Sequence, residues 1–411
     1  MEMTMQKKTV LGLQHVVAMF GATVLVPLLT GLNPSVALLA AGVGTLLFHL
    51  VTKRMVPVFL GSSFAFIPAI ILATERDYTW AAIGLGIMAA GVLYTAMSLL
   101  VAAVGHEVIQ RVFPPIVTGP VIIVIGITLA PIAINMSEGA WWLALVTMLT
   151  AVIAAVFFKG LFRMLPILTA AVVGYILGAI FFPDFSFAAV GEAAWVGLPE
   201  FTWGFGDISW APVALIAPIA FVTMIEHVGD IMANGSVVGK DFFEEPGLER
   251  TLLGDGIATL FAGLIGGPPN TTYSENTGVL AVTKVYDPLI LRIGAGFAIV
   301  LALIPKLAAI LRTTPVPVLG GLSIVLFGMI AAVGLRTLVN AQVDFMKSRN
   351  MIVVGLILVF GLGVSGLTNT LAIGDVPISG LALAAVVGVI VNLILPEPAE
   401  EDEFAMAPDV E

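Results

Sequence analysis

Residues 11–30 read LGLQHVVAMFGATVLVPLLT, an apolar run in which His15 is the one titratable side chain. A helix crosses the hydrocarbon core of a bilayer with about 20 such residues. Runs of this kind recur along the chain and are separated by charged or Pro/Gly-rich breaks. We therefore predict an all-α polytopic membrane protein with about fourteen segments, placed at 10–30, 34–52, 58–74, 79–104, 113–134, 138–158, 163–182, 209–234, 250–266, 271–284, 287–310, 316–335, 350–366 and 376–396.

The composition supports a membrane protein and argues against an enzyme. Of 411 residues, 59% are hydrophobic and 11% are charged, whereas a soluble domain has about 25% charged residues. The chain has no cysteine, four histidines, no HExxH motif and no nucleotide-binding loop. We expect no metal and no cofactor. Much of the net charge of −10 comes from the acidic stretch 397–411, which we interpret as a solvated tail.

The basic residues indicate how the chain is oriented. With a cytoplasmic N-terminus, the cytoplasmic loops contain every Lys and Arg except Arg76, Lys306 and Arg312. Positively charged loops face the cytoplasm. The loop around 183–208 is then external, both termini are cytoplasmic, and we expect a multi-pass protein of the cytoplasmic membrane.

A short repeat suggests two related halves. Both Pro115-Ile-Val-Thr-Gly119, continued to Gly126, and Pro317-Val-Leu-Gly-Gly321, continued to Gly328, fit P-x3-G-x6-G. The copies fall in predicted segments of opposite orientation. An inverted repeat of this kind is common in secondary transporters.

Ionisable residues inside the spans indicate where the chemistry lies, because each costs roughly 2.5–3.5 kcal/mol at a helix centre. Glu226 and Asp230, in TMIEHVGD at 223–230, are spaced i, i+4 and therefore lie on one helix face. This pair is a candidate proton carrier. The alternative is a structural pair that holds the helices together.

Two predicted segments are too short or too polar for continuous helices. GGPPNTTYSENTG at 266–278 has two prolines and two glycines before a stretch that favours extended backbone. GSSFAF at 61–66 occupies the matching place in the first half. Irregular backbone at membrane depth lines a cavity or is buried in protein, so these segments mark a candidate ligand site.

Three further polar positions are ambiguous. Gln14 and His15 lie in the first span, where a buried histidine is either a ligand group or a structural polar group. Asp255 stands early in segment 250–266, and we interpret it as a helix-start residue.

The motif residues resemble the nucleobase–ascorbate transporters, and in particular the bacterial uracil permeases. ENTGVLAVTK at 275–284 fits the [Q/E/P]-N-x-G-x4-T-[R/K/G] motif of that family. Similar matches are QH at 14–15, AMFGATVLVP at 18–27, LGSSFAF at 60–66, EHVG at 226–229 and NTTYSEN at 270–276.

The resemblance implies two inverted repeats of about seven segments each, with short strands in segments three and ten. It implies an elevator-like carrier, commonly a homodimer, in which a core domain moves against a gate domain. The core would comprise 10–104 and 209–310, and the gate would comprise 113–182 and 316–396.

The resemblance also implies the roles of individual residues. Glu226 and Glu275 would hydrogen-bond a nucleobase, Phe64 would pack on its ring, and Tyr273 and Ser274 would complete the pocket through their backbone. Supporting residues would be His15, Gln14 and Asn276. The expected partners are uracil, protons and the lipid bilayer, with no nucleic acid.

One departure leaves the substrate open. Many bacterial uracil permeases have His where this chain has Asp230, and purine-transporting relatives often have Asp there. Glu275 resembles the uracil branch, whereas Gln is more typical of xanthine and urate carriers. Ser274 also departs from a frequent Gly. A proton-coupled uracil importer is our first interpretation, a purine or xanthine carrier is the second, and an anion transporter of the same fold is the third.

Overall fold

The computed structural model describes residues 3–159, 165–182, 185–365, 372–373, 376–377 and 379–396. Helices dominate the described chain, as the sequence predicts. The N-terminal half contains α1 (Met5–Thr30), α2 (Pro34–Val51), β1 (Leu60–Ser62), the 3-10 helix η1 (Phe64–Phe66), α3 (Ile67–Glu75), α4 (Trp80–Val104), α5 (His106–Val112), α6 (Pro115–Thr128), α7 (Ala130–Ser137), α8 (Trp141–Phe157), α10 (Pro166–Phe181) and α11 (Ala188–Glu192).

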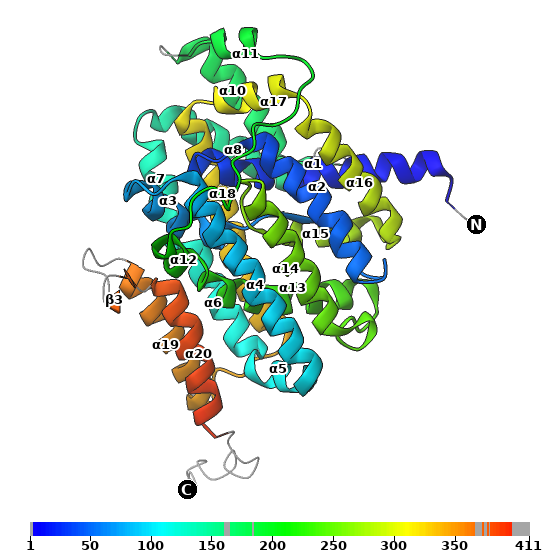
Figure 1. Ribbon diagram of the computed structural model, residues 1–411, viewed down its shortest axis with the longest axis vertical. Helices are drawn as coiled ribbons and strands as arrows, with labels where there is room; N and C mark the ends of the chain where they lie inside the picture. Colours follow the sequence, from blue (N-terminus) through cyan, green and yellow to red (C-terminus); the bar gives the residue numbers. More distant parts are fainter. Residues whose placement is uncertain are drawn as a thin grey trace, which may run out of the picture.

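The C-terminal half follows in Figure 1 from green to red. It contains α12 (Trp210–Ile216), α13 (Ile219–Val238), the π-helical turn η2 (Phe243–Gly247), α14 (Leu248–Leu264), β2 (Asn270–Thr272), α15 (Ser274–Thr283), α16 (Pro288–Ala302), α17 (Pro305–Arg312), α18 (Val316–Asn340), α19 (Ser348–Ser365), β3 (Ala372–Ile373), β4 (Val376–Pro377) and α20 (Gly380–Ile394). The predicted acidic tail 397–411 lies outside the described residues.

Several helices have the length and composition of membrane spans. Six helices of the described chain are long and apolar enough to cross a bilayer, and α16 with α17 makes a seventh if the bent pair counts as one. The prediction of a multi-pass helical protein is confirmed, and the number of about fourteen segments stays a prediction.

Prolines divide three of the predicted segments. The segment predicted at 287–310 consists of two helices, α16 and α17, which are bent by 79°, and Pro305 starts the second helix. Segment 113–134 is likewise divided into α6 and α7, and segment 209–234 into α12 and α13. Proline lacks the N–H that continues a helix, so it starts a new helix more readily than it extends one.

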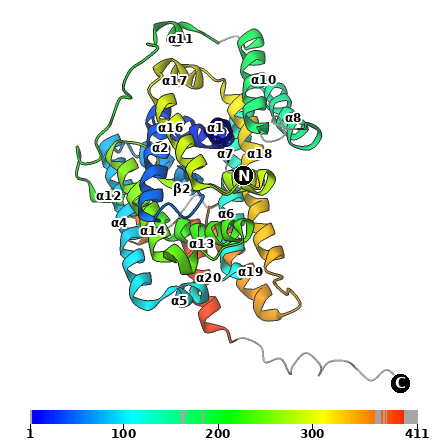
Figure 2. The same cartoon turned by 90° about the vertical axis from the view of Figure 1, so that its right-hand side faces the viewer.

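The helices pack in two sets. In the first helix set, α14 packs against α2 and α4, and α16 packs against α1 and α2. This set also includes α13, which contacts α4 and α14, together with α15 and η1, which contact α13. In the second helix set, α18 packs against α6, α7 and α8, and α19 packs against α20 and α6. Figure 2 shows α2, α4 and α14 on one side of the molecule and α8, α10, α18 and α19 on the other.

Glycines allow close contact within the first helix set. A Cβ atom on Gly91 of α4 would lie 2.6 Å from the Leu260 nitrogen, and one on Gly263 of α14 would lie 2.6 Å from the Met88 nitrogen. Small residues let membrane helices approach closely, where van der Waals contact stabilises their packing.

The repeated proline–glycine motif forms one interface. Pro115 is the first residue of α6 and Pro317 the second residue of α18, and these helices pack against each other. A Cβ atom on Gly126 would lie 2.5 Å from the Phe327 carbonyl oxygen. The motif therefore marks helices that meet, while the inverted orientation of the two halves stays a prediction.

The two broken segments pair with each other, which confirms the predicted strands. β1 and β2 are antiparallel, with Leu60 opposite Thr272 and Ser62 opposite Asn270. The pairing continues on both sides, because the Ser63 N–H donates to the Pro269 carbonyl at 2.8 Å and the Tyr273 N–H donates to the Phe59 carbonyl at 3.0 Å. Backbone N–H and C=O groups that lie outside a helix at membrane depth need hydrogen-bond partners within the protein, and the two strands provide them.

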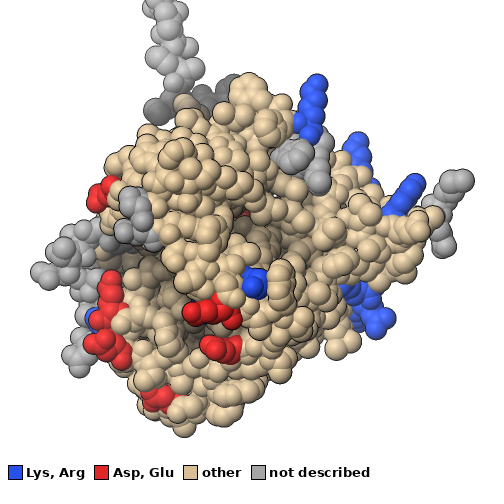
Figure 3. Space-filling view, turned by 90° about the horizontal axis from the view of Figure 1, so that it is seen from above, with Lys and Arg blue, Asp and Glu red and all other residues tan. Residues whose placement is uncertain are grey.

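Charge separates toward two sides of the surface. Figure 3 shows most of the visible Lys and Arg side chains on the right, on the side from which the N-terminal end of α1 projects in Figure 1, and Asp and Glu on the left.

We expect Gly61→Ala to destabilise the strand pair. A Cβ atom on Gly61 would overlap the Tyr273 ring and lie 2.7 Å from Thr23 Oγ1. The free energy of unfolding should fall by about 1–3 kcal/mol, measured by thermal unfolding of the purified protein in detergent. The control is Gly296→Ala in α16, where a Cβ atom meets nothing within 4 Å. Equal melting temperatures for the two variants would contradict the packing described here.

Candidate functional site

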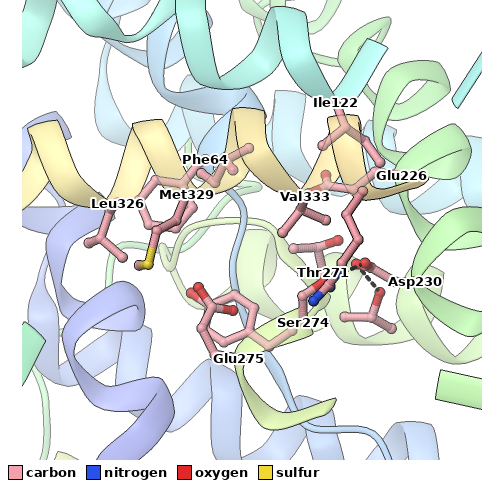
Figure 4. A pocket seen from close by; sticks show the side chains of 14 residues that line it. Phe64, Ile122, Glu226, Asp230, Thr271, Ser274, Glu275, Leu326, Met329 and Val333 are labelled. Carbon is pink, nitrogen blue, oxygen red and sulfur yellow. Dashed lines mark hydrogen bonds between the residues drawn. The ribbon is translucent and has the colours of Figure 1, made fainter. Parts of the chain in front are cut away.

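A cavity of about 200 Å³ lies where the broken segments meet α13 and α18 (Figure 4). One wall comes from the first helix set and contains most of the polar side chains. The opposite wall comes from α6 and α18 and is mainly apolar. The lining residues are Phe64, Ile122, Glu226, Asp230, Thr271, Thr272, Tyr273, Ser274, Glu275, Leu326, Met329, Ile330, Val333 and Arg336.

Asp230 connects α13 to the broken segment. Its Oδ1 accepts a hydrogen bond from the Ser274 hydroxyl at 2.6 Å, and its Oδ2 accepts one from the Thr272 hydroxyl at 3.1 Å. Figure 4 draws these bonds from Asp230 as dashed lines. The hydroxyl of Ser274, the residue that stands where Gly is frequent, therefore donates to Asp230.

Glu226 lies one helical turn before Asp230 and also lines the cavity. It is half-buried, and no residue within the described ranges donates a hydrogen bond to its carboxyl group. A carboxylate in an apolar wall without a partner is costly. Glu226 is thus the carboxyl group most available to a ligand.

Glu275 lies in the first turn of α15, and Tyr273 is the N-cap residue of that helix. The first N–H groups of a helix have no intrahelical acceptor, and the helix dipole adds partial positive charge there. No side chain caps this end of α15. The site thus combines backbone donors with the carboxylate acceptor of Glu275.

Two aromatic residues shape the cavity. Phe64 is 7% exposed and contacts Phe327 of α18 edge to face, with 5.9 Å between the ring centroids. The Tyr273 hydroxyl donates to the Ser62 carbonyl at 2.8 Å, which fixes its ring over β1. The two rings provide flat apolar surface beside the carboxyl groups.

The predicted supporting residues lie behind this wall and do not line the cavity. The Asn276 amide donates to the His15 carbonyl at 3.0 Å, and its nitrogen lies 3.1 Å from His15 Nδ1. Asn276 and His15 therefore join α15 to α1. Gln14 is half-buried beside His15 on α1.

Asp255 is not the helix-start residue that we expected, because α14 begins at Leu248. Its carboxylate lies 2.8 Å from His227 Nδ1, and both side chains are fully buried. His227 Nε2 contacts the Thr251 hydroxyl oxygen at 2.9 Å, and that hydroxyl already donates to the Leu248 carbonyl. The Asp255 carboxyl group and the His227 ring thus share a hydrogen bond that joins α14 to α13 next to Glu226.

Arg336 is the second residue that the sequence placed wrongly. We assigned it to a cytoplasmic loop after segment 316–335, whereas α18 extends to Asn340 and carries Arg336 into the cavity lining. For both Asp255 and Arg336 the sequence contained a signal. A charged residue inside or beside an apolar span costs free energy unless it has a role.

Comparison with known proteins identifies the family. A sequence model of the Permease family matches residues 6–370. The uracil permease of Bacillus caldolyticus is 44% identical over 94% of this chain and 91% of its own length. The uracil permease of Bacillus subtilis (strain 168) is 42% identical over 95% and 93%. The uracil permease of Escherichia coli (strain K12) is 39% identical over 93% and 90%.

Solved structures share the fold at much lower identity. The transmembrane domain of the cyanobacterial bicarbonate transporter BicA has a TM-score of 0.61 at 16% identity, covering 96% of this chain and 98% of that chain. The murine anion transporter Slc26a9 in the inward-facing state has a TM-score of 0.68 at 13% identity, covering 96% and 68%.

The predicted resemblance is confirmed, and so is the prediction of a transporter and not an enzyme: the chain belongs to the Permease family.

Proposed function

We propose that this protein imports uracil across the cytoplasmic membrane together with protons, and that uracil binds in the cavity between α13, α15 and α18. The observation that carries the proposal is the pair of carboxyl groups, Glu226 and Glu275, in an apolar cavity of about 200 Å³ beside two aromatic rings. Full-length relatives named uracil permease support the choice of substrate.

The chemistry of the cavity suits a flat ring with both donors and acceptors. Uracil has two N–H donors and two carbonyl acceptors. Glu226 and Glu275 accept from N–H groups, and the first N–H groups of α15 donate to a carbonyl. Phe64 and Tyr273 cover the ring faces.

Coupling to protons follows from the same carboxyl groups. A protonated carboxyl donates to a uracil carbonyl, which an ionised carboxylate cannot do. Substrate and proton then strengthen each other's binding by linkage. We assign the coupled proton to Glu226 and Asp230, which lie one turn apart on α13.

The proposed movement is of an elevator type. The core domain, 10–104 and 209–310, would carry the site past the gate domain, 113–182 and 316–396. Support comes from the position of the cavity between the two helix sets and from the contact of Phe64 with Phe327 across them. We further propose two inverted repeats of about seven segments, cytoplasmic termini and a homodimer.

The two other interpretations differ in what the cavity must bind. In a purine or xanthine carrier Asp230 would select the substrate, but both of its oxygens already accept hydrogen bonds from Thr272 and Ser274. An anion transporter would need net positive charge, but Glu226, Asp230 and Glu275 outnumber the single Arg336. The uracil proposal therefore fits the site best.

We expect Glu226→Ala to weaken uracil binding by about fivefold to a hundredfold, because a substrate group left without its hydrogen-bond partner in the cavity costs about 1–3 kcal/mol. Binding of radiolabelled uracil to purified protein measures this change. The control is Glu107→Ala, at an exposed position in the first turn of α5. Normal affinity in a Glu226→Ala protein that melts like wild type would refute the assignment of Glu226.

We expect an inward proton gradient to accelerate uracil uptake into proteoliposomes, because uracil and proton bind together. At equilibrium, uracil affinity should be highest at low pH and should be lost as rising pH removes the coupled proton. Xanthine in excess should leave uptake unchanged. A rate of uracil uptake that is the same with and without the proton gradient would exclude proton coupling. Transport of xanthine in place of uracil would favour the purine interpretation.

A further inference from the structure

One face of α18 forms the cavity wall opposite the site carboxyl groups. Leu326, Met329, Ile330 and Val333 follow the i, i+3, i+4, i+7 spacing of a single helix face, and Arg336 continues it. Four apolar residues are thus followed by a cation, at the end of the cavity nearest the C-terminus of α18.

Arg336 has no structural partner to explain its position. Its side chain is exposed, and no hydrogen bond or ion pair of Arg336 occurs among the residues that the structure describes. It provides the only side-chain nitrogen among the 14 residues that line the cavity. An arginine is charged at every physiological pH. A permanent cation without a partner among the described residues therefore lines the same cavity as three carboxyl groups.

The charges around the cavity come mainly from the first helix set. Glu226 and Asp230 of α13 and Glu275 of α15 line it with Arg336. His227 and Asp255 hydrogen-bond each other behind the wall. The remaining titratable groups near the carboxyl groups are the phenols of Tyr94 on α4 and Tyr273 before α15, and α6 contributes Ile122, which carries no charge.

We propose that Arg336 is a fixed counter-charge for the proton-carrying carboxyl groups. The proposal rests on the proposed proton-coupled function. When Asp230 and Glu226 lie opposite Arg336, its positive charge favours their ionised form. The carboxyl O–H bond then breaks, the proton passes to water in the cavity, and the carboxylate keeps the electron pair.

Loss of the proton from Glu226 also removes a donor to the substrate carbonyl. Release of the proton and release of uracil are therefore promoted on the same side of the membrane. Because Arg336 belongs to α18 and not to the first helix set, it stays behind when the site moves. The carboxyl groups leave its field and rebind a proton on the other side.

The test uses the absence of cysteine from the whole chain. Arg336→Cys introduces a unique thiol at the cavity. One sample is labelled with 2-(trimethylammonium)ethyl methanethiosulfonate, which restores a positive charge, and another with 2-sulfonatoethyl methanethiosulfonate, which adds a negative one. For each sample, uracil binding is measured against pH, and net proton-driven uptake is compared with uracil exchange.

In unlabelled Arg336→Cys we expect the pH midpoint of uracil binding to rise by about one unit, since an opposite charge nearby shifts a carboxyl group by about 1–3 units. Net uptake should fall about tenfold and exchange should be retained, because exchange needs no proton release. The cationic label should restore both values, and the anionic label should raise the midpoint further. Arg336→Lys should behave as wild type.

Arg312→Cys is the matched control, since Arg312 ends α17 and does not line the cavity; neither label should move its pH midpoint. An Arg336→Cys midpoint that is unchanged and insensitive to both labels would overturn the proposal. Loss of uracil binding in Arg336→Lys, with wild-type melting, would also overturn it, because Arg336 would then be a ligand contact. Failure of unsubstituted protein to take up uracil with protons would refute the proposed function itself.

Discussion

The pairing of β1 with β2 is the interaction on which the site depends. Two chain segments leave their helices inside an apolar environment, where every backbone N–H and C=O needs a partner within the protein. Each strand supplies those partners for the other, and the bonds from Ser63 to Pro269 and from Tyr273 to Phe59 extend the pairing. Phe64 of η1 and Ser274 of α15 consequently both line the cavity.

Further hydrogen bonds hold the helices in place around the pair of strands β1 and β2. Asp230 joins α13 to the strand through two hydroxyl groups, and Asn276 joins α15 to α1. The hydrogen bond between His227 and Asp255 fixes α13 to α14 behind the wall. A buried polar group that loses its partner is costly. This arrangement keeps Glu226 directed into the cavity without a protein partner.

The fold alone does not determine what is carried. Bicarbonate and anion transporters share it at 13–16% identity, whereas this chain places three carboxyl groups around its cavity. Function is set by the side chains of a site and not by the fold that holds them. The opposite wall on α18, apolar except for Arg336, gives the two sides of the cavity different charge.

The sequence by itself determined the properties that depend on neighbouring residues. Apolar runs predicted spans, the Pro/Gly clusters around 57–61 and 266–269 predicted broken segments, and Glu226 and Glu275 were identified by their charge. The tertiary structure alone decided the pairing of His227 with Asp255, the bend between α16 and α17, and the entry of Arg336 into the cavity. The physical reason is that hydrophobic periodicity and backbone breaks are local, whereas a partner from a distant helix is set by how the helices pack.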